Sequence, residues 1–146
     1  AAFEGKLRRN FQGFTDDPSD ILIGLGASAI SSFPHLLAQN EKNSGRYRMI
    51  ASQDQLAANR GIRRTADDRY RAAVVEQLLC QRRAQLGACL MREASEALRP
   101  FLDRGLASVD RQWLDILPEG LPYARTVAAI FDRYRQPQGR VFSSAV

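Results

Sequence analysis

The strongest constraint on the fold is an apolar, glycine-spaced run at residues 21–30, ILIGLGASAI. Nearly every position is apolar or small, which is too continuous for a half-exposed strand and too rich in glycine for a helix interior. Such a run predicts a strand buried on both faces. Gly24 and Gly26 would then point to the same face, where a ligand or a neighbouring backbone could approach closely.

The composition limits the class of protein. The chain has 146 residues, about one domain's worth, of which 45% are apolar and 25% charged. No apolar run approaches the roughly 18 residues of a membrane span, and residues 1–14 lack the apolar core of a signal peptide. Cys80 and Cys89 are too few for a disulfide framework, and their spacing matches no zinc or iron–sulfur pattern. These features predict a cytoplasmic protein with no membrane partner and no metal site of its own.

The charge is dominated by arginine, which supplies 19 of the 21 basic residues behind a net charge of +5. Arginine binds carboxylates and phosphates with two parallel hydrogen bonds, so an anionic partner is one interpretation. A genome that favours arginine codons is the simpler one. Charge by itself does not choose between a polyacidic metabolite, nucleic acid and no partner.

The first part of the chain is predicted to be mostly extended. Residues 3–14 form an extended segment that ends in a turn at residues 15–20, where Pro18 and several side-chain acceptors favour a loop. After the buried strand, residues 35–52 are predicted to form a short helix and loop, broken near residues 43–45.

The second part has clearer helical signals. Thr65 and Asp68 form a capping-box-like start for a helix over residues 67–86 that stops at Gly87. A second helix covers residues 91–104, with a kink or break caused by Pro100. The remaining elements are a hairpin of residues 106–109 and 113–117 anchored by Trp113, and a helix from Pro122 to Tyr134. The predicted fold is mainly α with a small β component, and this second part is winged-helix-like.

Several motifs have weaker functional readings. The spacing GxGxxA at residues 24–29 resembles a dinucleotide fingerprint, but here the glycines lie inside the predicted strand and not after it. His35 is the only histidine and has no partner in a recognisable motif, so a surface role is expected. Cys80 and Cys89 are expected to pack as small buried groups.

A winged-helix DNA-binding module is the main alternative from another functional class. Its basic residues cluster before and on the first helix, whereas the helix over residues 91–104 balances Arg92, Arg99 and Arg104 with acidic residues. A recognition helix would carry the excess of positive charge. We therefore predict no nucleic-acid partner and treat those charges as a solvated face.

Two motifs near the N-terminus, with supporting segments along the chain, resemble one family. The segments are GKLRRNFQGFT at residues 5–15, GLGASAIS at 24–31, AQN at 38–40, Tyr47, RGI at 60–62 and VFS at 141–143. They resemble the C-terminal third of bacterial oxygen-independent coproporphyrinogen III oxidase. The resemblance implies that residues 1–58 close an incomplete (β/α) barrel and that residues 59–146 form the C-terminal helical domain.

The resemblance also implies a chemistry. Members of this family are radical S-adenosylmethionine enzymes of haem biosynthesis, in which a [4Fe–4S] cluster cleaves the cofactor reductively. The radical formed abstracts hydrogen from two propionate side chains, which lose CO₂ and become vinyl groups. The cluster is held by three cysteines spaced CxxxCxxC, and no such motif occurs here. We therefore expect a fragment, inactive by itself, with no catalytic residue and no metal ligand. An oxidase-like haem chaperone is the alternative within the broader relationship.

Functional residues are carried over by motif. Gln12 and Ile30 match the family positions that contact the second S-adenosylmethionine. The substrate is a porphyrinogen with four propionates, and Arg8, Arg9 and Arg60 are the candidates for carboxylate contacts. The resemblance further implies a monomeric full-length enzyme, whereas the exposed edge of the apolar strand could make the fragment self-associate.

Overall fold

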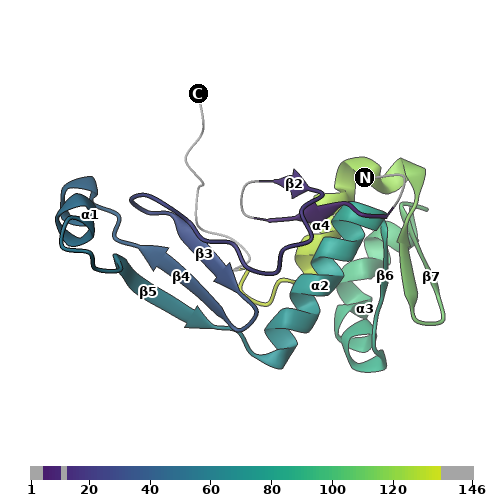
Figure 1. The fold of residues 1–146 in the computed structure, drawn as a ribbon. Helices are drawn as coiled ribbons and strands as arrows, with labels where there is room; N and C mark the ends of the chain where they lie inside the picture. The colour runs from purple at the N-terminus through teal and green to yellow at the C-terminus, as the bar shows by residue number, and fades with distance from the viewer. Residues whose placement is uncertain (1–4, 11–12, 136–146) are drawn as a thin grey trace. The chain divides into compact units, whose positions relative to one another are not determined.

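A computed structural model describes residues 5–10 and 13–135 of the chain (Figure 1). The chain divides into two compact units, Ala1–Tyr70 and Arg71–Val146. The predicted domain boundary between residues 58 and 59 falls inside strand β5 (Ala58–Arg63), which pairs with a strand of the first unit. As a domain boundary it stays a prediction.

The first unit consists of two small antiparallel sheets and one short helix. Strands β1 (Arg8–Arg9) and β2 (Phe14–Thr15) pair with each other, which agrees with an extended start to the chain. The other sheet has the order β3-β4-β5. Its remaining elements are β3 (Ile30–Phe33), β4 (Leu36–Asn40) and helix α1 (Ser44–Ala51), which lies between β4 and β5 in sequence.

The predicted buried strand at residues 21–30 is wrong. Strand β3 begins only at Ile30, and before it Leu22 makes a single isolated bridge to Ser32. Ile23 and Leu25 are 67% and 87% exposed. The apolar run predicted burial, but residues 26–29 form a turn in which Gly26 and Ser28 have positive φ values of 106° and 61°, and such φ values interrupt an extended strand.

The predicted helix within residues 35–52 is also wrong in its first half. Residues 36–40 form β4, the central strand, and α1 starts where a break was expected. Asn43 explains the start, because its side chain accepts a hydrogen bond from the Arg46 N–H at 3.0 Å and so caps the helix.

The second unit is built around a closed apolar core. Its elements are α2 (Ala66–Gln81, which begins in the first unit), β6 (Arg83–Gln85), α3 (Ala88–Leu102), β7 (Ala107–Asp110), β8 (Trp113–Ile116), 3₁₀-helix η1 (Pro118–Tyr123), α4 (Ala124–Ala128) and η2 (Ala129–Phe131). The sheet order is β6-β8-β7. The core contains Val74, Leu78, Leu90, Leu98, Leu114, Val127 and Phe131.

The capping box that was predicted for the first long helix is present. The Thr65 N–H and hydroxyl donate to Asp68 Oδ2 at 2.8 and 2.7 Å, and the Asp68 N–H donates to Thr65 Oγ1. The helix ends earlier than predicted, at Gln81, because Arg82 has a φ of 62° and the chain then enters β6. A short strand that pairs with a distant partner leaves no local pattern.

The later elements follow the prediction with two corrections. The hairpin β7–β8 is confirmed, and α3 runs through Pro100 to Leu102, so of the kink or break expected at Pro100 the break is absent. Pro100 cannot donate the usual hydrogen bond to the carbonyl four residues earlier, but only two helical residues follow it, so its effect is confined to the last turn. The last predicted helix is replaced by short 3₁₀ and α segments, although two residues of its predicted apolar face, Val127 and Phe131, are fully buried.

The fold as a whole is mixed α/β, with more strand than was predicted. The winged-helix description of the second unit stays a prediction. In the described part of the chain, none of the helices has the length and apolar character needed to cross a membrane.

Candidate functional site

The two residues carried over by motif and the three candidate arginines belong to the first unit, and four of the five are described. Ile30 begins β3, Arg8 and Arg9 form β1, and Arg60 lies in β5. Gln12 lies outside the described residues.

Strand register places Ile30 and Arg60 in one row of the sheet. Ile30 pairs with Gln39 of β4, and Gln39 pairs in turn with Arg60 of β5. Directly opposed residues of antiparallel strands place their side chains on the same face. The spacing between neighbouring strands is about 4.8 Å, so Ile30 and Arg60 are about 10 Å apart across the sheet. A ligand against Ile30 would therefore be within reach of the long, exposed Arg60 side chain.

The chain that precedes Ile30 packs closely against its backbone. We call residues 24–29 the glycine loop. A Cβ placed on Gly24 would lie 2.6 Å from the Ile30 carbonyl oxygen and 2.9 Å from the Ile30 nitrogen. The close approach that the glycine spacing predicted is therefore made at Gly24 by a neighbouring backbone. Gly26 has a φ of 106° and nothing near its missing side chain.

The glycine loop is held by side chains from β3, β4 and α1. Asn40 Nδ2 donates to the carbonyl oxygens of Gly24 and Gly26, at 3.1 and 3.0 Å. The Tyr47 hydroxyl accepts from the Gly26 N–H, and Ser31 Oγ accepts from the Gly24 N–H, both at 3.1 Å. Sequence reasoning noted Asn40 and Tyr47 only as matching positions, because a contact between distant residues has no local signal.

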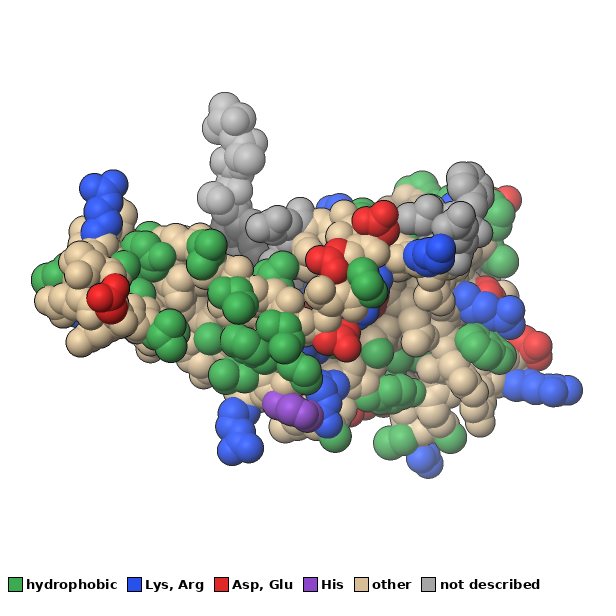
Figure 2. All heavy atoms as spheres, in the orientation of Figure 1, with side chains coloured by type: hydrophobic (Ala, Val, Ile, Leu, Met, Phe, Trp, Pro, Cys, Tyr) green, Lys and Arg blue, Asp and Glu red, His purple; other side chains and the backbone are tan. Residues whose placement is uncertain are grey.

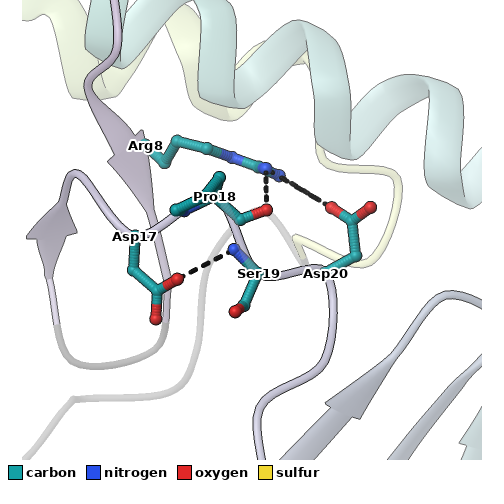
Figure 3. Close-up of polar contacts among 5 residues, drawn as sticks. All are labelled: Arg8, Asp17, Pro18, Ser19 and Asp20. Carbon is teal, nitrogen blue, oxygen red and sulfur yellow. Dashed lines mark hydrogen bonds and ion pairs between the residues drawn. The ribbon is translucent and has the colours of Figure 1, made fainter.

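Arg8 makes contacts that hold the N-terminal loop together (Figure 3). Its guanidinium donates to the Pro18 carbonyl oxygen at 3.0 Å and to Asp20 Oδ1 at 3.3 Å. In the same loop the Ser19 N–H donates to Asp17 Oδ1, and this hydrogen bond holds the pKa of Asp17 below its usual value. A substrate carboxylate at Arg8 would therefore compete with Asp20. Arg9 is exposed on β1.

His35 and the cysteines do not assemble into a reactive site. His35 is exposed, as expected, and its Nδ1 lies 2.6 Å from a guanidinium nitrogen of Arg69. Cys80 is partly buried on α2, whereas Cys89 is exposed on α3, which corrects the prediction that both are buried. Within residues 5–10 and 13–135, no three His, Cys, Asp or Glu side chains are grouped so as to hold a metal ion. The residues present do not fit an iron–sulfur cluster.

The chain is similar to a set of curated proteins that share one name. Oxygen-independent coproporphyrinogen III oxidase of Bradyrhizobium diazoefficiens is 36% identical over 99% of this chain and 34% of its own length. The protein of the same name from Cereibacter sphaeroides is 38% identical over 94% of this chain and 33% of its own length. The chain thus spans about a third of these relatives. No family model matches it.

A solved structure gives the same assignment. Coproporphyrinogen III oxidase from Escherichia coli, described as a radical SAM enzyme, superposes with a TM-score of 0.83 at 34% identity, covering 92% of this chain and 33% of that one. The chain is homologous to part of the oxygen-independent coproporphyrinogen III oxidases. The family resemblance seen in the sequence is therefore confirmed, and with it the fold of the coproporphyrinogen oxidase region that the chain matches.

Proposed function

We propose that the chain acts as the C-terminal third of an oxygen-independent coproporphyrinogen III oxidase. Such an enzyme decarboxylates two propionates of coproporphyrinogen III oxidatively and leaves two vinyl groups. The observation that carries the proposal is the similarity to the Escherichia coli enzyme, at 34% identity and a TM-score of 0.83 over 92% of the chain. The CxxxCxxC cysteines would have to come from the rest of such a protein, because this chain has only two cysteines.

The first unit would contribute one wall of a cofactor site. S-adenosylmethionine supplies the radical that starts this chemistry when it is bound. Gln12 has an amide that can both donate to and accept from polar groups of such a ligand, and Ile30 offers an apolar surface to the same ligand. The fit is supported by the partial burial of Ile30 and by Gln39 and Arg60 in the same row of the sheet.

Arg60 is the best placed of the three candidate arginines for a substrate carboxylate. It is exposed on β5 and forms no ion pair with another residue of the described chain, so its guanidinium is available for a bidentate contact. Arg9 remains a second candidate. Arg8 is a weaker one, because binding a propionate there would require Asp20 to be displaced.

A chimera tests the proposal. The matching third of the Bradyrhizobium diazoefficiens enzyme is replaced by this chain, the protein is loaded with cluster under anaerobic conditions, and protoporphyrinogen IX is measured. We expect product formation, and Arg60→Ala is expected to raise KM for the porphyrinogen. A chimera that holds iron and sulfide as the parent does, yet forms no product while the parent is active, would contradict the proposal.

A further inference from the structure

Asn40 is the residue on which the geometry of the glycine loop depends most. Its side-chain nitrogen lies 3.1 Å from the Gly24 carbonyl oxygen and 3.0 Å from the Gly26 carbonyl oxygen, in a partly buried setting. A carboxamide nitrogen carries two hydrogens, so both hydrogen bonds can be made at once. The main chain adds a third contact, because the Asn40 N–H donates to the Ala29 carbonyl oxygen at 2.9 Å.

Two further side chains complete the polar contacts of the loop glycines. The Gly24 N–H donates to Ser31 Oγ, and the Gly26 N–H donates to the Tyr47 hydroxyl. The N–H and the carbonyl oxygen of each of these two glycines therefore form a hydrogen bond with a side chain from outside the loop. Partly buried peptide groups that lose such partners are costly, so the loop has one favoured position.

The position of the loop bears directly on Ile30. Gly24 is in contact with the Ile30 peptide, since a Cβ there would lie 2.6 Å from the Ile30 oxygen. Ala29, the last loop residue, is bonded to the Asn40 backbone and directly precedes Ile30. A displaced glycine loop would therefore remove the support on one side of Ile30.

We propose that Asn40, together with Tyr47, is a positioning residue for Ile30, the apolar surface of the proposed S-adenosylmethionine site. Asn40 acts through the glycine loop on Ile30 and does not itself contact S-adenosylmethionine. The part of this inference that concerns the cofactor rests on the proposed function. The part that concerns the loop rests on the hydrogen bonds alone, so the two parts can be tested separately.

The loop is tested in the 146-residue chain with Asn40→Asp. The substitution keeps the shape but replaces two donors with a carboxylate that faces two carbonyl oxygens. We expect amide exchange across residues 24–30 to become about tenfold faster. Asn43→Asp is the matched control, because Asn43 accepts a hydrogen bond from the Arg46 N–H and an aspartate accepts it equally well. If the amide exchange rates across residues 24–30 are the same in Asn40→Asp, in the Asn43→Asp control and in the parent, the inference is overturned.

A second variant covers the case in which Asn40→Asp unfolds the first unit. Tyr47→Phe keeps the ring and removes only the acceptor of the Gly26 N–H. We expect faster exchange confined to the glycine loop, with the amides of β4 and β5 unchanged. Unchanged exchange at Gly26 in this variant would count against the inference, whatever Asn40→Asp does.

The cofactor part is tested in the chimera by equilibrium dialysis with S-adenosylmethionine. Asn40→Asp is expected to weaken binding of the second S-adenosylmethionine, the one assigned to Gln12 and Ile30, about tenfold. The affinity for the first S-adenosylmethionine and the cluster content should not change. If the chimera without this substitution binds no S-adenosylmethionine, the proposed function fails and the result on the loop stands. If Asn40→Asp speeds exchange in the loop and binding is unchanged, the positioning role is overturned and the proposed function stands.

Discussion

The two units differ in where their apolar side chains lie. The second unit closes a core in which Leu78, Leu114 and Phe131 are completely buried. In the described part of the first unit, Ala57 is the one apolar residue below 9% exposure, while Leu25 is 87% and Ile62 64% exposed. Hydrophobic side chains gather on the face shown in Figure 2 where Figure 1 draws β3–β5.

This difference implies two sources of stability. Burial of apolar surface is the main driving force of folding, and the second unit contains its own. The first unit relies on strand pairing and on polar contacts such as those of Asn40 and Glu41, each of which adds only about 1 kcal/mol net. We therefore expect the first unit to open at lower free energy than the second.

Truncating one leucine in each unit should give the largest contrast. Leu78→Ala removes a fully buried side chain and is expected to lower the free energy of unfolding by about 2–5 kcal/mol. Leu25→Ala, at an 87% exposed position, should change it by less than about 0.5 kcal/mol. Urea unfolding followed by the fluorescence of Trp113, the single tryptophan, reports on the second unit, and amide exchange in β3–β5 at increasing urea reports on the first. Equal losses in the two variants would show that the comparison is mistaken.

The glycines in close contact give an intermediate effect. A Cβ on Gly120 would lie 1.9 Å from the Leu106 carbonyl oxygen, so Gly120→Ala should destabilise the second unit by about 1–3 kcal/mol. Gly24→Ala should displace the glycine loop and leave the Trp113 transition unchanged, because its contact is with Ile30 in the first unit.

Gly61→Ala serves as the control for both glycine variants. A Cβ placed on Gly61 would have Leu36 Cδ1 as its nearest neighbour, at 3.4 Å, which is an ordinary contact with a flexible side chain. We expect little change in either unit. A loss for Gly61→Ala as large as that for Gly120→Ala would mean that any added methyl group is harmful and that backbone contact is not the cause.

The same contrast explains what the sequence could predict. The helices of the second unit were found because Val74 and Leu78, or Leu90, Ala94 and Leu98, repeat on one face and are indeed buried. In the first unit the apolar run at residues 21–30 was assigned to a buried strand, because hydropathy patterns assume that apolar residues point inward. Here Ile21, Ile23 and Leu25 are exposed.

The candidate site was predictable only by residue identity. Ile30 was named from a motif and Arg60 as a candidate carboxylate contact, but the row that they share with Gln39 depends on strand register, which no local pattern reveals. Likewise, the role of Asn40 depends on two carbonyl groups about fifteen residues earlier in the chain.

Acid should loosen the first unit before the second, through Glu41. The hydrogen bond from the Asn43 N–H to Glu41 Oε1, at 2.9 Å, is the main reason that the pKa of Glu41 lies below 4.5, and Arg46 and Asn59 add to the shift. A carboxyl group whose pKa is lowered on folding stabilises the fold above its unfolded pKa, and this stability is lost as the pH falls through the folded value.

Amide exchange in α1 and β5, measured from about pH 6 to about pH 3, checks this prediction after correction for intrinsic rates. We expect protection to fall below pH 4.5 in the parent and to depend less on pH in Glu41→Gln, which keeps an acceptor for the Asn43 N–H. An identical pH profile in the variant would assign the acid sensitivity to another group.

The smallest effect is expected at Arg83, on the exposed side of the second unit. Its guanidinium carbon lies 4.5 Å from the centre of the Trp113 ring, and its Nε lies 3.3 Å from Asp115 Oδ1. Because both contacts are open to solvent, Arg83→Gln should cost at most about 1 kcal/mol in urea unfolding.

Arg83→Lys separates the two contacts, since lysine can keep the ion pair but lacks the planar group that stacks on the ring. If the ion pair dominates, Arg83→Lys will resemble the parent and molar salt will remove the difference from Arg83→Gln. A loss comparable with that of Leu78→Ala would mean that the second unit depends on its surface contacts as much as on its core. Burial of apolar side chains would then not be enough to explain the difference in stability between the two units.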